Sequence, residues 1–401
     1  MKSLKFTSFI IVSLLACVGY AQDAKPAVEI PTAVTIEDRN KDRSYVEDFA
    51  DKPATITQVD KSGTKETPMT LKSVSSKEFI LVDASGGELA VPKKTDAYKF
   101  TVKPDSNWQR ARNAFSSGDW NEAIVYLRPT VYPVLAFTAF SEDACARVHG
   151  LVEMYITALL NANRLNEAKA LVLALPLNDI PAQLLSSVIG VGEALAAENR
   201  LNDAIALANR INFDDSNMAA MSDMMAFLGS LRKMGATKEC SLWYTKLSNI
   251  EKNPSKDEAK MWMVYCDLQM GNKMSAEVFL SGMKVDRNSE SFSLLQMIKG
   301  MLKSTGDKPN YSEALDLYAE GIVFGSLSSP WMPELLFDAG MTYKKLGKFI
   351  PANEIFAQMA ALYPNDPLAV KGLKEVVKVE KKVKKKVVDE DEDEDEDEED
   401  E

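Results

Sequence analysis

The residues that could carry out chemistry are few and lie far apart along the chain. His149 is the single histidine, and it lies in a segment with a helical pattern. A structural or catalytic zinc site needs several nitrogen or sulfur ligands, so zinc is not expected. The sequence also lacks a GxSxG elbow, a P-loop and a dinucleotide-binding fingerprint. We therefore predict that the protein is not an enzyme and needs no metal or cofactor.

Four cysteines offer the other reactive groups, and none has the CxxC spacing of a redox or metal site. Cys17 belongs to the N-terminal apolar run, whereas Cys145, Cys240 and Cys266 lie in the body of the chain. An odd number of thiols in an oxidising compartment leaves at least one unpaired. Cys240 and Cys266 fall where the helical pattern requires small buried residues, so we interpret them as inert core cysteines.

The first residues, MKSLKFTSFIIVSLLACVGYAQ, combine two lysines with an apolar run and then small residues. This pattern predicts a signal peptide at residues 1–21, cleaved after Ala21, and hence export to the periplasm or cell envelope of a bacterium. The stretch LLAC offers an alternative, because it is similar to a bacterial lipobox and would make Cys17 the lipid-bearing first residue of an outer-membrane lipoprotein. Residues 22–52 are polar and charged, which is typical of a flexible leader.

The net charge of the chain is concentrated at its C-terminal end. The formal net charge is -12, but residues 389–401 are all acidic, and the rest of the chain carries 47 basic against 46 acidic residues. A neutral body offers no basic face to nucleic acid. The acidic run repels itself and lacks apolar residues, which predicts a disordered tail. A solvated tail without a partner, weak cation binding, binding of a basic partner and folding back on the preceding lysines all stay open.

Residues 53–104 have a sequence pattern typical of β-strands. Five short apolar or alternating runs (ATITQV, PMTLKSV, EFILVDA, ELAVP and YKFTV) are separated by turn-forming residues. The segment LKSVSSKEFILVDASGGELAVP resembles the central meander of SH3-like or Sm-like barrels, in which a strand that ends in a Gly-Gly hairpin is followed by a second apolar strand. We predict a small all-β domain at residues 53–104.

From residue 106 onward the pattern becomes helical, and one feature recurs. A small residue follows each tight turn, where a second helix must cross the first closely. These small residues are Ala123, Ala168, Ala204, Cys240, Ala276, Ala314 and Ala352. From Ala168 to Ala276 they are 36 residues apart, which predicts a series of helical hairpins. A residue that tolerates the left-handed conformation ends each first helix: Gly118, Asn163, Asn199, Gly235, Gly271, Gly306 and Gly347.

The last hairpin carries the strongest motif, in the stretch AGMTYKKLGKFIPANEIFAQMAALYPNDP. It resembles the tetratricopeptide repeat (TPR) family at Gly340, Tyr343, Gly347, Ala352, Phe356 and Pro364. The other units are degenerate, although Gly192, Gly300 and Tyr318 keep parts of the motif. The resemblance implies a mainly α fold, in which residues 106–364 form a TPR-like α-solenoid of about seven hairpins. It also implies a scaffold that binds protein or peptide partners. A membrane partner is expected only if the chain is lipidated at Cys17.

The resemblance places a binding groove along the first helix of each hairpin. The groove positions carried over by register are Met225, Met261, Tyr265, Phe337, Met341 and Lys344. Methionine and aromatic side chains suit irregular apolar peptides, because the thioether chain adapts its shape. The alternative is an ordinary core, since apolar side chains at helical spacing usually face one.

Residues 365–388 follow the last hairpin and predict a lysine-rich capping helix. Asp366 is in position to cap the helix, and Pro367 suits its first turn. Leu373, Val376 and Val383 fall on one side, whereas lysines occupy the other. A polar cap of this kind shields the open end of a stack of repeats.

Overall fold

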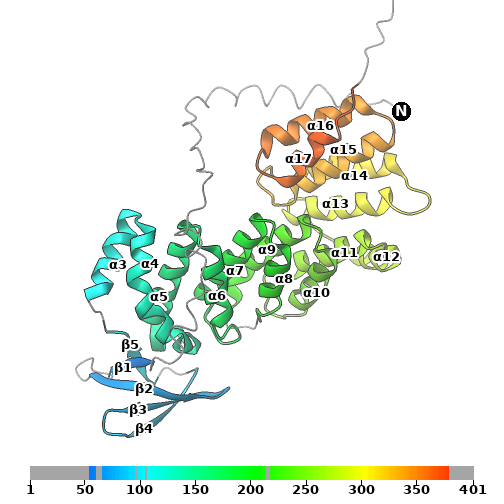
Figure 1. The fold of residues 1–401 in the computed structure, drawn as a ribbon. Helices are drawn as coiled ribbons and strands as arrows, with labels where there is room; N and C mark the ends of the chain where they lie inside the picture. Colours follow the sequence, from blue (N-terminus) through cyan, green and yellow to red (C-terminus); the bar gives the residue numbers. More distant parts are fainter. Residues whose placement is uncertain (1–53, 60–65, 95–96, 104–105, 214–216, 379–401) are drawn as a thin grey trace, which may run out of the picture. The chain divides into compact units, whose positions relative to one another are not determined.

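The computed structural model describes residues 54–59, 66–94, 97–103, 106–213 and 217–378. Over these residues the chain is mainly helical, with a small antiparallel sheet on the N-terminal side (Figure 1). The predicted signal peptide (1–21), leader (22–52) and acidic tail (389–401) lie outside the described residues, and so do Cys17 and Ala21. No helix among the described residues is long and apolar enough to cross a membrane.

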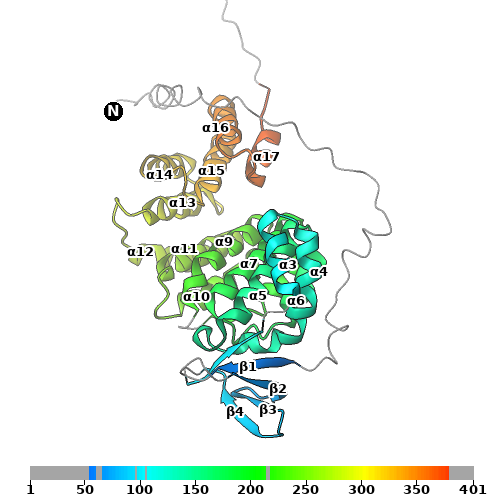
Figure 2. The ribbon, with the colours of Figure 1, turned by 90° about the vertical axis from the view of Figure 1, so that its left-hand side faces the viewer.

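The sheet contains five strands that coincide with the five predicted runs. They are β1 (Thr55–Val59), β2 (Glu66–Val74), β3 (Glu78–Asp83), β4 (Glu88–Pro92) and β5 (Lys99–Thr101). Every pairing is antiparallel, and the order is β4-β3-β2-β1-β5. Figure 2 labels β1 to β4 of this sheet. The predicted Gly-Gly hairpin joins β3 to β4, where Asp83 Oδ1 accepts the N–H groups of Ser85 and Gly87, both at 2.8 Å.

One face of the sheet is covered by the segment that connects the first two helix pairs. This segment contains the 3₁₀ helix η3 (Tyr132–Ala139), and it interrupts the regular spacing of the repeats in the stretch PTVYPVLAF. The Phe140 ring stacks on Phe79 of β3 at 4.2 Å and on Phe100 of β5 at 4.9 Å between centroids. Phe137 and Val148 complete the same apolar cluster. The sheet therefore shares its core with the helices.

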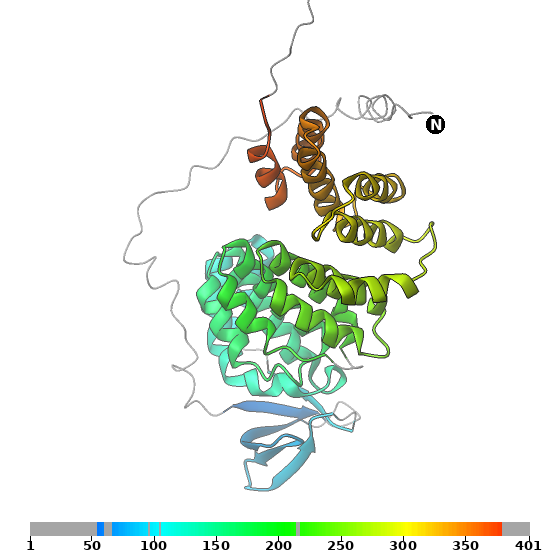
Figure 3. The same cartoon turned by 90° about the vertical axis from the view of Figure 1, so that its right-hand side faces the viewer.

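The helices follow one another in pairs that pack together across short turns (Figure 3). The pairs are α3 (Ser106–Ser117) with α4 (Trp120–Val131), α5 (Glu142–Asn161) with α6 (Leu165–Ala174), α7 (Ala182–Ala197) with α8 (Leu201–Ala208), α9 (Met221–Lys233) with α10 (Thr237–Ser248), α11 (Lys256–Gln269) with α12 (Lys273–Gly282), α13 (Ser291–Ser304) with α14 (Tyr311–Phe324), and α15 (Met332–Lys345) with α16 (Phe349–Leu362). A short 3₁₀ turn, η4 (Met218–Ala220), precedes α9, and α17 (Pro367–Lys374) follows the last pair.

The turns inside the pairs confirm the predicted left-handed residues. All seven have a positive φ, from 57° at Asn163 to 95° at Gly235. The seven small residues that follow these turns are at most 1% exposed, which confirms that each lies where two helices meet. The rules that place both features act within a few residues of the chain, so the sequence alone specifies them.

Glycines on the first helices accept large aromatic rings. At Gly192 of α7 a β-carbon would lie 2.5 Å from Phe227 of α9, the first helix of the next pair. At Gly300 of α13 the ring is that of Tyr318 on α14, the second helix of the same pair. The glycine of a first helix can therefore pack against a ring from the second helix of its own pair or from the first helix of the next pair. At Gly192 the ring comes from the next pair, because the short α8 has no aromatic side chain.

The end of the last pair is covered by α17. The predicted cap at its first turn is confirmed, because Asp366 Oδ1 accepts the N–H of Leu368 at 2.9 Å and Pro367 opens the helix. The helix ends at Lys374. The side chain of Asn353 on α16 then bonds both the N–H (3.0 Å) and the carbonyl (2.7 Å) of Val377. Residues 379–388 of the predicted capping helix lie outside the described residues.

Candidate interaction surface on the first helices

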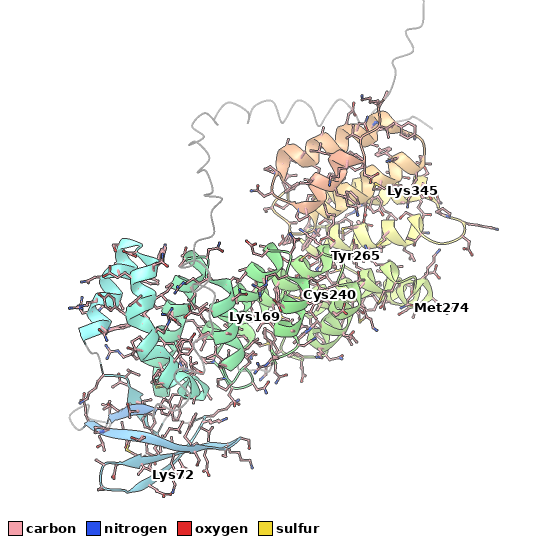
Figure 4. All side chains as sticks on the ribbon, in the orientation of Figure 1. Lys72, Lys169, Cys240, Tyr265, Met274 and Lys345 are labelled. Carbon is pink, nitrogen blue, oxygen red and sulfur yellow. The ribbon has the colours of Figure 1, made fainter. Side chains whose placement is uncertain are left out.

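The six groove residues predicted from the TPR register lie on three first helices. Met225 is on α9, Met261 and Tyr265 are on α11, and the remaining three are on α15. Figure 4 labels Tyr265 among the side chains of this region. Met225, Met261, Tyr265 and Phe337 are at most 8% exposed and belong to one apolar core. In this conformation these four residues pack inside the protein.

Met341 and Lys344 are the groove residues that reach the surface, because both are half-buried. Lys344 Nζ pairs with the Glu375 carboxylate at 2.7 Å and also donates to the Glu375 carbonyl at 3.2 Å. Lys344 thereby holds the end of α17 against α15. Met341 is packed against the apolar core and is the one apolar groove residue that is partly exposed.

The residues of the TPR motif are brought together in the last pair. Gly340 on α15 faces Phe356 on α16, and the buried ring of Phe356 lies 6.1 Å from that of Phe337. Ala352 is buried between the two helices, and Gly347 ends α15 with a φ of 70°. Tyr343 is half-buried, and Pro364 lies exposed in the turn after α16. These residues shape the hairpin, and none of them forms a site on its own.

A buried polar cluster that sequence reasoning missed lies beside Tyr265. Arg232, in the last turn of α9, stacks on Trp262 of α11, with Cζ 3.5 Å from the ring centroid, and lies 5.0 Å from the Tyr265 centroid. Its guanidinium forms an ion pair with Glu334 at the start of α15. The next residue, Lys233, pairs with Asp366, the cap of α17, at 2.7 Å. Two adjacent cations at the end of α9 thus hold α15 and α17.

Carboxyl groups around this cluster have perturbed protonation equilibria. Burial raises the pKa of Asp338 to about 7, and the neighbouring charge of Glu334 acts in the same direction. Burial also raises the pKa of Glu258, although the Trp262 N–H that it accepts at 3.1 Å opposes the change. The pKa of Tyr265 is raised by burial as well. The cluster therefore combines two carboxyl groups of raised pKa, Glu258 and Asp338, with the guanidinium of Arg232 that stacks on Trp262.

A second polar cluster, between α4, α5 and α6, surrounds a carboxylate whose two oxygens both accept hydrogen bonds. Arg128 donates to both oxygens of the buried Glu167 carboxylate at 3.1 Å, and Arg164 lies 3.4 Å from the same group. The hydroxyl of Tyr155 also donates to Glu167, and its ring packs edge-on against Tyr132. Every carboxylate oxygen has donors, so we interpret this cluster as structural.

The thiols and the histidine are buried core groups, and Cys240 and Cys266 lie near enough to Arg232 for its charge to act on them. Cys145, Cys240 and Cys266 are buried, and burial raises the pKa of each thiol to about 12. The His149 Nε2 atom lies 3.0 Å from the Thr138 carbonyl in η3, and burial lowers the pKa of this histidine. Within the described ranges no three His, Cys, Asp or Glu side chains stand close enough to hold a metal ion.

One signal in the sequence points to the missed cluster. Glu334 and Asp338 are acids four residues apart within the otherwise apolar stretch 332–341 of a first helix, so they share one face of that helix. Acids in such a position need a partner when they are buried. The sequence does not identify Arg232 as that partner, because it is 102 residues away along the chain.

Comparison with known proteins gives no assignment: no protein-family model matches the chain, and no curated protein matches it. The function therefore has to be argued from the described geometry.

Proposed function

We propose that the protein is an exported, non-enzymatic scaffold of a bacterial cell envelope, in which a TPR-like solenoid binds protein or peptide partners. The observation that carries the proposal is the repeated turn, in which seven left-handed residues are each followed by a buried small residue. A helical hairpin repeated in this way buries its apolar faces by stacking on its neighbours. Stacked hairpins present their first helices as a common wall.

Contacts between successive first helices support this arrangement. Helix α5 packs on α7, α7 packs on α9, α11 packs on α13, and α13 packs on α15. Repeat proteins use such a wall as a binding surface, because it offers many side chains at regular spacing. Met341 and Lys344 are half-buried members of this wall. The acidic tail adds a second proposed contact, with a basic partner or weakly bound cations.

The proposal is tested by placing a photo-crosslinking amino acid at Met341 and, in a matched variant, at Ile350. Ile350 lies on the second helix of the same pair and is 60% exposed, so it is more accessible than Met341 but belongs to the outer face. Both variants are expressed with the native N-terminus, irradiated in intact cells, and analysed by mass spectrometry of the adducts.

We expect a discrete protein adduct from residue 341 and none, or a different set, from residue 350. An excess of synthetic peptide derived from the captured partner should compete with the adduct at 341. Equal adducts from both positions would show that the first helices have no privileged role, and the proposal would then fail.

A further inference from the structure

The guanidinium of Arg232 lies against Trp262 and Tyr265. These two rings form, with Tyr244 and Trp331, a connected cluster of four aromatic side chains that we call the aromatic cage. The rings of Tyr244 and Trp262 are stacked at 6.4 Å, Tyr265 meets Trp262 edge-on at 5.4 Å, and Trp331 meets it at 62° and 6.4 Å. All four side chains are buried. Flat rings around a cation attract it through the negative charge of their faces.

The cage is held in shape by hydrogen bonds that do not involve Arg232. The Trp262 N–H donates to Glu258 at 3.1 Å, and the Trp331 N–H donates to the hydroxyl of Ser293 on α13. The Tyr265 hydroxyl accepts a hydrogen bond from Gln269 at 3.0 Å. Three of the four rings thus have an anchor other than Arg232, whereas the Tyr244 hydroxyl has none of this kind among the described residues.

The ion pair between Arg232 and Glu334 leaves one hydrogen-bonding atom of each side chain without a partner among the described residues. One of its terminal nitrogens bonds Glu334 Oε2, whereas Arg232 Nε and Glu334 Oε1 have no hydrogen-bond partner among the described residues, and Glu334 is only 3% exposed. A guanidinium can offer a carboxylate two parallel N–H groups. Arg232 uses only one of its N–H groups on this carboxylate. Asp338 Oδ2, one turn further along α15, is likewise buried without a partner in the described part of the chain.

We propose that the aromatic cage with Glu334 is a binding site for an arginine side chain of a partner peptide, and that Arg232 is its internal occupant. The proposal rests on the peptide-binding function proposed above, and it specifies which side chain of the peptide the first helices recognise. A guanidinium fits this site better than an ammonium, because it is planar, stacks on Trp262 and matches the fork of a carboxylate. An incoming arginine, free of the constraint at Arg232, can bond both oxygens of Glu334.

Arg232 comes from a different helix pair than its carboxylate partner. It reaches the cage from α9, whereas Glu334 belongs to α15, so exchange of the cation requires these two helices to part. The adjacent Lys233–Asp366 pair resists the same movement. An internal occupant lowers the apparent affinity for an external arginine, because the ligand must displace it first.

The test uses the mature protein with Arg232→Ala and measures thermal unfolding with and without L-argininamide. We expect millimolar argininamide to raise the melting temperature of Arg232→Ala by about 2 °C or more, since a ligand that binds only the folded state stabilises it. Citrullinamide, which has the same shape without the charge, should give no rise. Wild type, whose cage is occupied, and Lys169→Ala, whose lost cation pairs with Asp203 away from the cage, should not respond to argininamide.

A folded Arg232→Ala variant that shows no rise with argininamide, or the same rise with citrullinamide, would overturn the proposal. If Arg232→Ala does not fold, Arg232→Lys replaces it, and argininamide must then raise its melting temperature while lysinamide does not. A partner cross-linked at Met341 whose binding is unaffected by replacing each of its arginines would overturn the arginine site and leave the scaffold function intact.

Discussion

A β-carbon placed on Gly340 would lie 2.5 Å from the ring of Phe356, so the two helices of the last pair touch at a point where no other residue fits. We expect Gly340→Ala to lower the free energy of unfolding by about 2 kcal/mol, because the buried ring has to move or the helices have to separate. Chemical denaturation followed by circular dichroism measures the change.

Gly190→Ala is the matched control for that substitution. Gly190 also lies inside a first helix, α7, but a β-carbon there meets no atom within 4 Å. Alanine should therefore be neutral or stabilise by about 0.5–1 kcal/mol through its higher helix propensity. Equal losses at both glycines would mean that the contact with Phe356 is not what requires Gly340.

Removal of the buried carboxylate at Glu167 should be severe. The Glu167→Ala variant leaves Arg128 without its bidentate partner in the interior, and we expect a loss of about 3 kcal/mol or more in the free energy of unfolding. Lys169→Ala on the same helix breaks a partly exposed pair with Asp203 and should cost less than about 1 kcal/mol. Denaturation midpoints of the two variants measure the difference, and equal losses would contradict the prediction.

Asp338 should make the stability of the protein depend on pH. In the unfolded chain this carboxyl has an ordinary pKa near 4, whereas burial raises the pKa in the folded chain to about 7. Between these values the folded state binds more protons than the unfolded state, so the free energy of unfolding falls as the pH rises from about 4 to about 7. Above that window this contribution stays constant.

The Asp338→Asn variant removes this titration. Its stability relative to wild type should therefore improve by about 1 kcal/mol or more between pH 5 and pH 8, measured as melting temperatures in matched buffers. Glu334, Arg232, Lys345 and Lys371 lie near Asp338 and are unchanged in both proteins. Asp257→Asn, at an exposed carboxylate of α11, should keep a constant difference from wild type. A pH-independent difference for Asp338→Asn would contradict the prediction.

The mature N-terminus separates the two predicted modes of export. Cleavage after Ala21 gives a protein that begins at Gln22, whereas lipidation gives one that begins at an acylated Cys17. We expect the intact mass of the protein from cells to match a start at Gln22, and Cys17→Ser to leave processing unchanged. A mass increased by acyl chains, lost in Cys17→Ser, would establish the lipoprotein alternative.

Local backbone rules made the turns of the helix pairs predictable from the sequence. The left-handed residues and the small residues after them depend on neighbours within a few positions, and all of these were placed correctly. The five strands followed from their alternation and turn residues for the same reason. The Phe227 ring at Gly192 was not predictable, because the motif assigns that place to a residue on α8.

The buried contacts across distant helices were beyond sequence reasoning. Tyr265 was identified by register, but Trp262 beside it and Arg232 above its ring were not. The ion pair of Arg232 with Glu334 depends on how three helix pairs pack, and nothing in the spacing along the chain encodes that distance. The predicted groove residues lie on first helices, and the same packing decides which of them are buried.

The apolar cluster that the β-sheet shares with the helices limits where this protein can be cut into folded fragments. Phe79 and Phe100 are shielded by Phe140, which follows the sheet only after two intervening helices. A fragment that stops before α3 would leave these rings in water, so it would precipitate or seek another apolar surface. The sheet is thus not a detachable module, and a fragment that keeps it folded has to include the chain through α5.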